Sequence, residues 1–404
     1  MSTLTPEKTS AAIRVVVAIL ILDILGLGLI VPVLPELVTE LSGGDPTAAA
    51  RWFGPLVAIY AALQFLFAPA VGALSDRYGR RPILLVSVAA LGLNYVVQAV
   101  APTLIWLFIG RAVAGIAGAS ITTVQATLAD LSTPETRSRN FGLVGAAFGI
   151  GFILGPAMGG ALSELGLRAP FTAAAILSFI NLAVAARVLP ETLPEEQRRP
   201  FRWREAHPIA SLSRLANVGG IGGMVIALAV MSFAQRGLES AWVLHAGIRY
   251  GWGALANGLT LGLVGLLAAI TQGGVIRTVV PRFGEPRVIL VGILLTALAY
   301  GIYGLAYVPA LLFVAMPLSS LGAMAVPTLQ GRIAGQVDPS EQGAIQGGIA
   351  SVLALVASIA PVVATQALAW GSAREPALYG APFFLGAVMM LLAFAVAYRA
   401  LRQH

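Results

Sequence analysis

Two acids and two arginines lie within otherwise apolar stretches of this sequence. Asp23 lies in the middle of the first stretch and Arg111 in the fourth, and Arg236 and Glu239 are three residues apart in the seventh. A carboxyl group removed from water holds its proton more tightly, which brings its pKa toward the physiological range. Residues of these types, so placed, are suited to bind and release protons or to hold a charged solute.

The composition indicates the environment in which these charged residues lie. Of the 404 residues, 58% are hydrophobic and only 11% are charged, whereas soluble domains carry about 25% charged residues. The apolar stretches are close to the roughly 20 residues that an α-helix needs to cross a bilayer. We therefore predict an all-α membrane protein. There is no cysteine and the three histidines are scattered, so we expect no metal site.

Twelve transmembrane helices are predicted from windows of about 20 residues. They are expected near 13–35, 53–74, 82–101, 104–125, 141–162, 169–189, 217–242, 253–275, 287–306, 308–331, 343–369 and 380–401. The first stretch is too long for the core of a signal peptide and no cleavage site follows it, so we expect it to remain as the first helix.

A polar segment at 190–216 separates an N-terminal six-helix half, 1–189, from a C-terminal half, 217–404. We interpret it as a cytoplasmic linker whose basic run touches anionic lipid headgroups. A weak repeat links the halves, because Arg-Tyr-Gly at 77–79 matches Arg-Phe-Gly at 282–284. Two pseudo-symmetric halves with a site at the midplane between them are typical of transporters.

The distribution of basic residues predicts the orientation. With the N-terminus in the cytoplasm, nineteen of the 25 Lys and Arg residues fall in cytoplasmic segments and four in outer segments. Both termini are therefore expected in the cytoplasm, since cytoplasmic loops are rich in Lys and Arg. This bias also accounts for the net charge of +7 without nucleic acid as a partner.

Each charged residue within a helix has a structural alternative. Asp23 is either a permanently hydrogen-bonded acid or a group that carries a proton or contacts a solute. Arg111 either snorkels to the outer surface or provides a fixed positive charge beside a carboxyl group. We place Arg236 and Glu239 near the outer end of their helix, as an interfacial ion pair or, if Glu239 faces a cavity, with Glu239 as a second proton-binding group.

Two motifs, at 72–82 and 151–160, can be compared with what turns and helix packing require. The loop at 72–82 reads Gly-Ala-Leu-Ser-Asp-Arg-Tyr-Gly-Arg-Arg-Pro. Glycine allows a tight turn and arginines keep it in the cytoplasm, but neither explains the acid, Asp76. Residues 151–160 read Gly-Phe-Ile-Leu-Gly-Pro-Ala-Met-Gly-Gly. Small residues four apart let helices approach closely and the proline kinks the helix, so packing alone would explain the glycines.

Both motifs resemble signatures of the major facilitator superfamily. The loop is similar to its signature loop, and the 151–160 string is similar to the antiporter motif of its drug:proton exporters. The resemblance implies an ionic latch in which Asp76 meets the start of the helix near 343 and Arg80 meets Asp130. Latch residues are then Gly72, Asp76, Arg77, Gly79, Arg80, Arg81 and Asp130, and antiporter-motif residues are Gly151, Gly155, Pro156, Gly159 and Gly160.

Amide side chains recur inside the predicted helices, which suggests a wet cavity for a polar, polycyclic solute as well as interhelical hydrogen bonds. The ten are Gln64, Asn94, Gln98, Gln125, Gln235, Asn257, Gln272, Gln330, Gln346 and Gln366. Together with Asp23, we expect Gln64, Asn94, Gln272, Gln330 and Gln346 to bind the substrate.

Within the superfamily the sequence most resembles the tetracycline:proton antiporters. The likeness runs along the chain and includes Asp-Ile-Leu-Gly-Leu-Gly from Asp23, Gly-Arg-Ala-Val-Ala-Gly at 110–115 and Pro-Thr-Leu-Gln-Gly at 327–331. The resemblance implies that Asp23 corresponds to the family's functional acid in helix one. It also implies that Gln64 and Gln272 correspond to polar positions of the family's cavity.

Three positions depart from the tetracycline antiporters. Their helix-three acid is Asn94 here, their helix-nine acid has no counterpart within 287–306, and their helix-eight histidine corresponds to Ala268. These departures remove part of the family's proton and metal-chelate chemistry. The substrate therefore stays open between a tetracycline, a related drug, an endogenous metabolite and a lipid-like solute.

These observations predict a proton-coupled antiporter that exports drug-like molecules across the bacterial inner membrane by alternating access. Asp23, Arg111 and Glu239 are the proton-coupling candidates. The alternatives are a symporter or facilitator for a metabolite, and a non-transporting membrane sensor or scaffold. No catalytic residue and no cofactor is expected beyond the proton gradient, and a divalent metal could enter only as a chelate with the substrate. The expected partners are the small molecule, protons and membrane lipids, with a monomeric chain.

Overall fold

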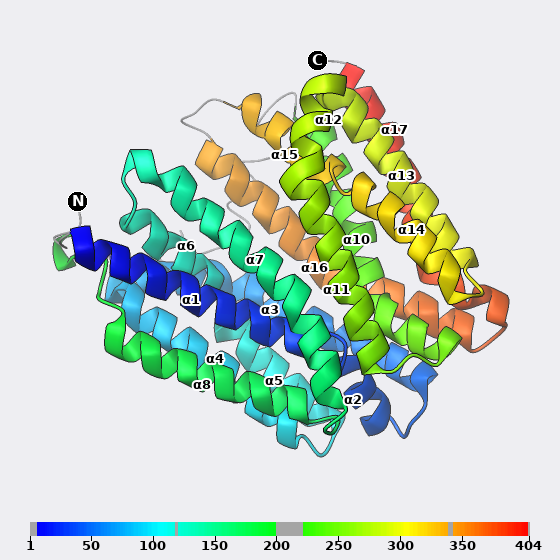
Figure 1. The fold of residues 1–404 in the computed structure, drawn as a ribbon, viewed down its shortest axis with the longest axis horizontal. Helices are drawn as coiled ribbons and strands as arrows, with labels where there is room; N and C mark the ends of the chain where they lie inside the picture. Colours follow the sequence, from blue (N-terminus) through cyan, green and yellow to red (C-terminus); the bar gives the residue numbers. More distant parts are fainter. Residues whose placement is uncertain (1–5, 118–119, 199–220, 338–341, 403–404) are drawn as a thin grey trace. The chain divides into compact units, whose positions relative to one another are not determined.

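The computed structural model describes residues 6–117, 120–198, 221–337 and 342–402, and every regular element in these ranges is helical (Figure 1). Up to residue 198 the elements are α1 (Pro6–Ile30), α2 (Leu34–Leu41), α3 (Pro46–Tyr78), α4 (Arg80–Val100), α5 (Leu104–Ala117), α6 (Ser120–Asp130), α7 (Pro134–Ser163), α8 (Ala169–Val188) and the 3-10 turn η1 (Glu195–Gln197). From residue 221 they are α10 (Gly222–Tyr250), α11 (Ala254–Ile270), the π-helical η2 (Thr271–Val275), α12 (Ile276–Phe283), α13 (Glu285–Leu305), α14 (Pro309–Gly322), α15 (Ala325–Gly335), α16 (Gln342–Ser372), the 3-10 turn η3 (Pro376–Gly380) and α17 (Ala381–Arg402).

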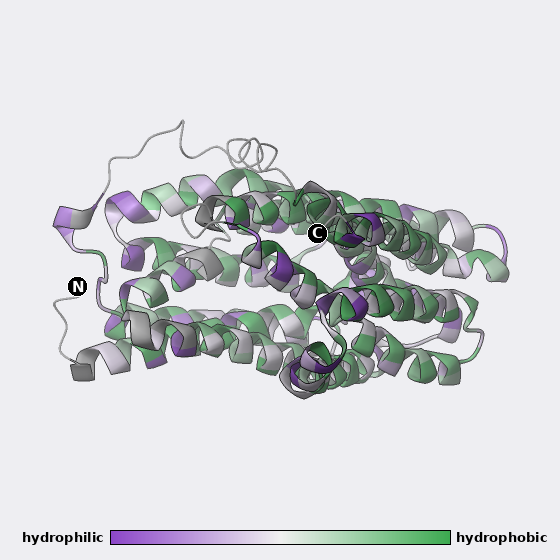
Figure 2. Cartoon of the chain, turned by 90° about the horizontal axis from the view of Figure 1, so that it is seen from above, coloured by the Kyte–Doolittle hydropathy of each residue, from purple (hydrophilic) through white to green (hydrophobic). Residues whose placement is uncertain are grey.

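Ten spans in the described ranges are long and apolar enough to cross a membrane. The other two expected spans correspond to α5 followed by α6, and to α10, whose three charged residues, Arg236, Glu239 and Arg249, lower its hydropathy. Apolar residues predominate along the helices in Figure 2. The prediction of an all-α membrane protein is therefore confirmed.

The largest correction concerns the seventh predicted helix. It was expected at 217–242, but α10 continues to Tyr250 and ends at Gly251, whose φ of 65° closes the helix. Arg236 is therefore in the middle of this helix and not near its outer end, and Glu239 lies only one turn beyond it. The last turns were missed because His245 and Arg249 make them more polar than a membrane window.

The chain forms two compact units. Unit 1 comprises residues 1–37, 62–207 and 254–262, and unit 2 comprises residues 38–61, 208–253 and 263–404. Helices α2, α3 and α11 therefore each contribute to both units. The predicted halves at 1–189 and 217–404 stay a prediction, and most of the linker between them, 199–216, lies outside the described residues.

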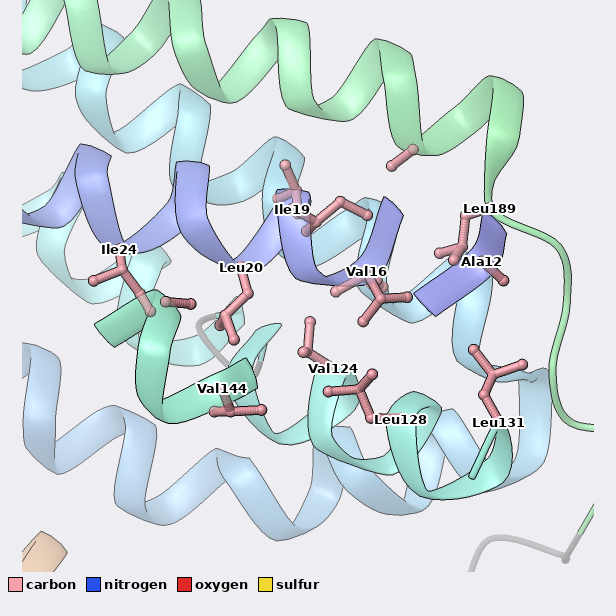
Figure 3. Close-up of a cluster of buried hydrophobic side chains, with 14 residues drawn as sticks. Ala12, Val16, Ile19, Leu20, Ile24, Val124, Leu128, Leu131, Val144 and Leu189 are labelled. Atoms are coloured by element: carbon pink, nitrogen blue, oxygen red, sulfur yellow. The ribbon is translucent and has the colours of Figure 1, made fainter. Parts of the chain in front are cut away.

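A buried aliphatic cluster holds unit 1 together (Figure 3). One face of α1 supplies Val16, Leu20 and Ile24, which pack with Val124 and Leu128 of α6. These α1 residues are four apart, as expected for one face of a helix. The packing fixes α1, and with it the position of Asp23, against the neighbouring helices.

In unit 2 the helices are held together by a cluster of aromatic side chains. The rings of Trp242 and Tyr303 are 5.3 Å apart, and those of His245 and Phe383 are 4.6 Å apart. His245 Nδ1 lies 2.9 Å from the carbonyl oxygen of Tyr379. A neutral imidazole that donates to this carbonyl fits a buried histidine, so His245 has a structural role here.

Candidate functional site

Asp23 lies buried inside unit 1, with 2% of its surface exposed. Asn181 on α8 donates from Nδ2 to Asp23 Oδ1 over 3.0 Å, and also to the carbonyl oxygen of Ile19 over 3.1 Å. The acid is therefore held between α1 and α8. Asn181 was not predicted from the sequence, although an amide within the apolar stretch 169–189 was a signal for it.

Further polar groups lie on the helices around Asp23. Gly26, one turn beyond Asp23, packs against Tyr95 on α4, because a Cβ added to this glycine would lie 3.4 Å from the tyrosine ring. One on Gly110 of α5 would lie 3.0 Å from Asn94 Oδ1. Arg111, the next residue, is 9% exposed. Unit 1 therefore buries an acid, a base and several amides among α1, α4, α5 and α8.

Two of these amides, Asn94 and Gln98, have buried polar atoms that lack a hydrogen bond within the described ranges. Asn94 Oδ1 and both amide atoms of Gln98 are buried without a hydrogen-bond partner among the described residues. Such a group costs about 1–3 kcal/mol unless water or a ligand satisfies it. The side chain of Asn94 is buried in this structure, and its contact with substrate stays a prediction.

The other amides expected to bind substrate are more accessible. Gln64 on α3 and Gln330 on α15 are half-buried, whereas Gln272 and Gln346 are exposed. Gln272 lies in η2, a single π-helical turn that contains Gly273 and Gly274. Turns of this kind are frequent at functional sites. Asp23, Gln64 and Asn94 belong to unit 1, and the remaining three to unit 2.

A hydrogen-bonded network surrounds the ion pair on α10. Arg236 Nη1 lies 3.0 Å from Glu239 Oε2, and Gln235 Nε2 donates to Glu239 Oε1 over 3.0 Å. Tyr300 on α13 donates its hydroxyl proton to Gln235 Oε1 over 2.8 Å. The arginine and the glutamate are 56% and 43% exposed, so this network reaches the protein surface in the middle of α10, a span predicted from the sequence.

The residues of the predicted latch gather where α3 meets α4. Arg80 contacts Asp130 from Nε over 3.1 Å and Asp76 from Nη1 over 2.6 Å, and it donates to Ser75 Oγ over 3.2 Å. The ion pair expected between Arg80 and Asp130 is thus present. The contact of Asp76 with the helix near 343 would join the two units and stays a prediction.

Glu191 lies beside the latch residues at the start of α4 and was not predicted from the sequence. Its carboxylate accepts the backbone N–H groups of Arg80 over 2.9 Å and Arg81 over 3.3 Å, at the start of α4. It also accepts those of Thr192 and Leu193. Gly79 has a φ of 103°, and a Cβ there would collide with the same carboxylate. A carboxylate at a helix N-terminus satisfies free N–H groups and the helix dipole together.

Not every residue of the loop motif is equally constrained. A Cβ on Gly72 would meet nothing within 4 Å. The guanidinium of Arg81 donates to the carbonyl oxygen of Ala186 over 2.6 Å, whereas Arg77 is exposed and lies over the ring of Tyr78. Steric need for glycine in this motif is therefore confined to Gly79.

The glycines of the 151–160 motif lie at close helix contacts within unit 1. A Cβ on Gly155 would lie 2.6 Å from Gly28 Cα on α1, and one on Gly151 or Gly159 would collide with α1 at Ile24 or Leu29. A Cβ on Gly160 would lie 2.6 Å from the carbonyl oxygen of Ala254 on α11. The motif, which includes Pro156, therefore lets α7 pack closely against α1 and the start of α11.

Within the described residues, no three His, Cys, Asp or Glu side chains are grouped so that they could hold a metal ion. A chain of apolar helices with buried charges and exposed mid-span polar groups defines a multi-pass membrane transporter. The profile of the Major Facilitator Superfamily matches residues 16–281, and this chain belongs to that superfamily.

Known relatives cover almost the whole chain. The class C tetracycline resistance protein of Escherichia coli is 35% identical over 385 residues, which are 95% of this chain and 96% of that protein. The class G tetracycline resistance protein of Vibrio anguillarum is 34% identical, with 94% and 96% covered. The crystal structure of the human organic anion transporter MFSD10 (TETRAN) has 27% identity and a TM-score of 0.72, with 98% and 100% covered.

Proposed function

We propose that this protein is a proton-coupled antiporter that exports drug-like molecules of the tetracycline type across the bacterial inner membrane by alternating access. The observation that carries the proposal is the buried carboxyl group of Asp23, held by Asn181 in a chain whose relatives are tetracycline resistance proteins. An acid placed inside a membrane domain is costly, and such residues mark proton and substrate pathways.

The roles divide between the two units. Asp23 binds a proton, Arg111 provides a fixed positive charge in the same unit, and Glu239 is the second proton-binding candidate. The residues that contact the substrate are Asp23, Gln64, Asn94, Gln272, Gln330 and Gln346. The contact of Arg80 with Asp130 stabilises one conformation of the transport cycle.

The remaining features follow from this function. The chain works as a monomer without a cofactor and without catalysis, both termini lie in the cytoplasm, and basic segments contact anionic lipids. The Arg-rich cytoplasmic face is consistent with this orientation. A metabolite symporter would share the fold but would carry its solute inward together with protons, and a facilitator would move its solute without a proton gradient.

The test is transport in everted membrane vesicles with tetracycline as the probe. Wild-type vesicles should accumulate tetracycline when respiration acidifies their interior, and an uncoupler should abolish accumulation. Asp23→Asn removes the titratable group at nearly constant size and should abolish proton-driven accumulation. Unchanged accumulation with Asp23→Asn would remove Asp23 from the mechanism, and accumulation without a proton gradient would overturn the antiport proposal.

A further inference from the structure

The ion pair of Arg236 and Glu239 is exposed in the middle of α10. At 1.5 Å per residue, Arg236 lies about 21 Å from each end of this helix. With side-chain exposures of 56% and 43%, both residues reach the protein surface. A charge at this depth that faced lipid would have to enter hydrocarbon, so such residues instead face water-filled cavities. The pair therefore lines a hydrated surface.

The network behind the pair holds it in place. The hydroxyl of Tyr300, a residue with 1% exposure, donates to Gln235 Oε1. This bond orients the amide so that its Nε2 donates to Glu239 Oε1. Pre-oriented groups lose little freedom when they bind a ligand. The arrangement is that of a built binding site, because Tyr300 on α13 positions polar groups on α10.

Arg236 and Glu239 both have more hydrogen-bonding positions than their ion pair uses. A guanidinium has five N–H donors, and a carboxylate offers about four acceptor positions. Among the described residues, the Arg236 side chain donates from Nη1 to Glu239. Its remaining donors form the fork that matches a planar oxyanion. A cationic group can approach the carboxylate of Glu239 in the same way.

The charge balance of the pair selects the class of ligand. A neutral solute offers no charged group that replaces either partner of the ion pair, and a solute with one charge leaves the other partner without its counter-charge. A zwitterion supplies both charges, so neither residue loses its counter-charge. We infer that Arg236 and Glu239 are a binding site for zwitterionic solutes, with Arg236 on the oxyanion and Glu239 on the ammonium group.

This inference rests on the proposed export function and extends it to a substrate class. A proton and an ammonium group compete for the same carboxylate, which is the exchange that antiport requires. The site lies wholly within unit 2, on a helix position that neither the Asp23 cluster nor the loop and antiporter motifs include.

The test measures equilibrium binding to the purified full-length protein in lipid nanodiscs, without a proton gradient. Tetracycline carries an ammonium group and an oxyanion, whereas 4-dedimethylaminotetracycline keeps the oxyanion and lacks the ammonium. Wild-type protein should bind tetracycline at least tenfold more tightly than the analogue. Glu239→Gln should bring this ratio close to one, and Arg236→Gln should weaken both probes while the ratio persists.

Matched variants separate recognition from folding. Glu239→Asp keeps the charge and should keep a ratio well above that of Glu239→Gln. The control ion pair is Arg332 with Glu285, 3.3 Å apart in the same unit, and Arg332→Gln should leave the ratio unchanged. Equal weakening of both probes by Glu239→Gln, or an unchanged ratio, would overturn the inference. Proton-driven efflux of other drugs by a protein that binds no tetracycline would also overturn it, while the export function would stand.

Discussion

Asn181 Nδ2 on α8 lies 3.0 Å from Asp23 Oδ1 on α1, and both side chains are at most 2% exposed. The amide also donates to the backbone carbonyl oxygen of Ile19, so its position is fixed by α1 itself. A donor aimed at a carboxylate stabilises its charged form, by about 1.5–3 kcal/mol for bonds to charged groups. Asn181 is therefore a positioning residue for the acid on which proton coupling depends.

Asn181→Ala should reduce proton-driven efflux by about tenfold or more, because a lost stabilisation of 1.4 kcal/mol corresponds to a factor of ten. The measurement is the initial rate of tetracycline uptake into everted vesicles across a pH series, where a change in the shape of the profile identifies an effect on Asp23. Ser178→Ala is the control, since Ser178 is a buried residue on α8 three positions earlier. Equal losses in both variants would mean that α8 packing, and not the bond to Asp23, is responsible.

Gly159→Ala should destabilise the protein, because the new methyl group would collide with the backbone carbonyl of Leu29 on α1. Overpacking of this kind costs about 1–3 kcal/mol. Thermal unfolding in detergent should show a lowered Tm. Gly149→Ala lies on the same helix with nothing within 4 Å of the new Cβ, and it should leave the Tm equal or raised. A normal Tm for Gly159→Ala would show that α1 and α7 are further apart than described.

Glu191→Ala should lower the Tm, because α4 would lose the carboxylate that accepts the N–H groups of Arg80 and Arg81. Loss of an N-terminal cap costs about 0.5–2 kcal/mol. Glu196→Ala is the matched control, since Glu196 is an exposed acid of the same segment. If both variants unfold at the same temperature, the carboxylate of Glu191 does not stabilise α4.

The apolar stretches predicted the helical fold because membrane spans must be about 20 residues long and poor in charge. They failed at the end of α10, where His245 and Arg249 lower the hydropathy although the helix continues to Tyr250. Breaks within spans were also invisible, since the π-helical turn at 271–275 and the division of α14 from α15 depend on packing and not on composition.

The candidate site was predicted less completely than the fold. Residue types pointed to Asp23 and Arg111, and the resemblance of the loop motif implied the ion pair of Arg80 with Asp130. They could not show that Asn181, 158 positions from Asp23, is its partner, or that Glu191 caps α4 from 111 residues away. Such contacts between distant segments require the helix arrangement, which no single window of sequence contains.

Gln98→Leu should stabilise the protein. Both amide atoms of Gln98 are buried without a partner among the described residues, and its side chain has 0% exposure. Replacing the amide by an apolar group of similar size removes a penalty of about 1–3 kcal/mol. The Tm in detergent checks this, with Gln366→Leu as the control because Gln366 donates to the carbonyl oxygen of Arg51. A lowered Tm for Gln98→Leu would indicate that bound water or another ligand satisfies the amide.

Glu36→Gln should raise stability at neutral pH and leave it unchanged in acid. Burial raises the pKa of Glu36 above its ordinary value of 4.5, the backbone N–H of Ala254 lowers it, and the nearby charge of Glu164 raises it. A raised pKa in the folded state means that the stability contributed by this carboxyl group is full below pH 4.5 and is lost as the pH rises through the folded-state pKa. The glutamine cannot ionise and retains an oxygen for Ala254, so the Tm difference between variant and wild type should grow from pH 4.5 to neutral pH. Glu164→Gln should give a smaller effect of the same sign, and a Tm difference independent of pH would contradict the assignment.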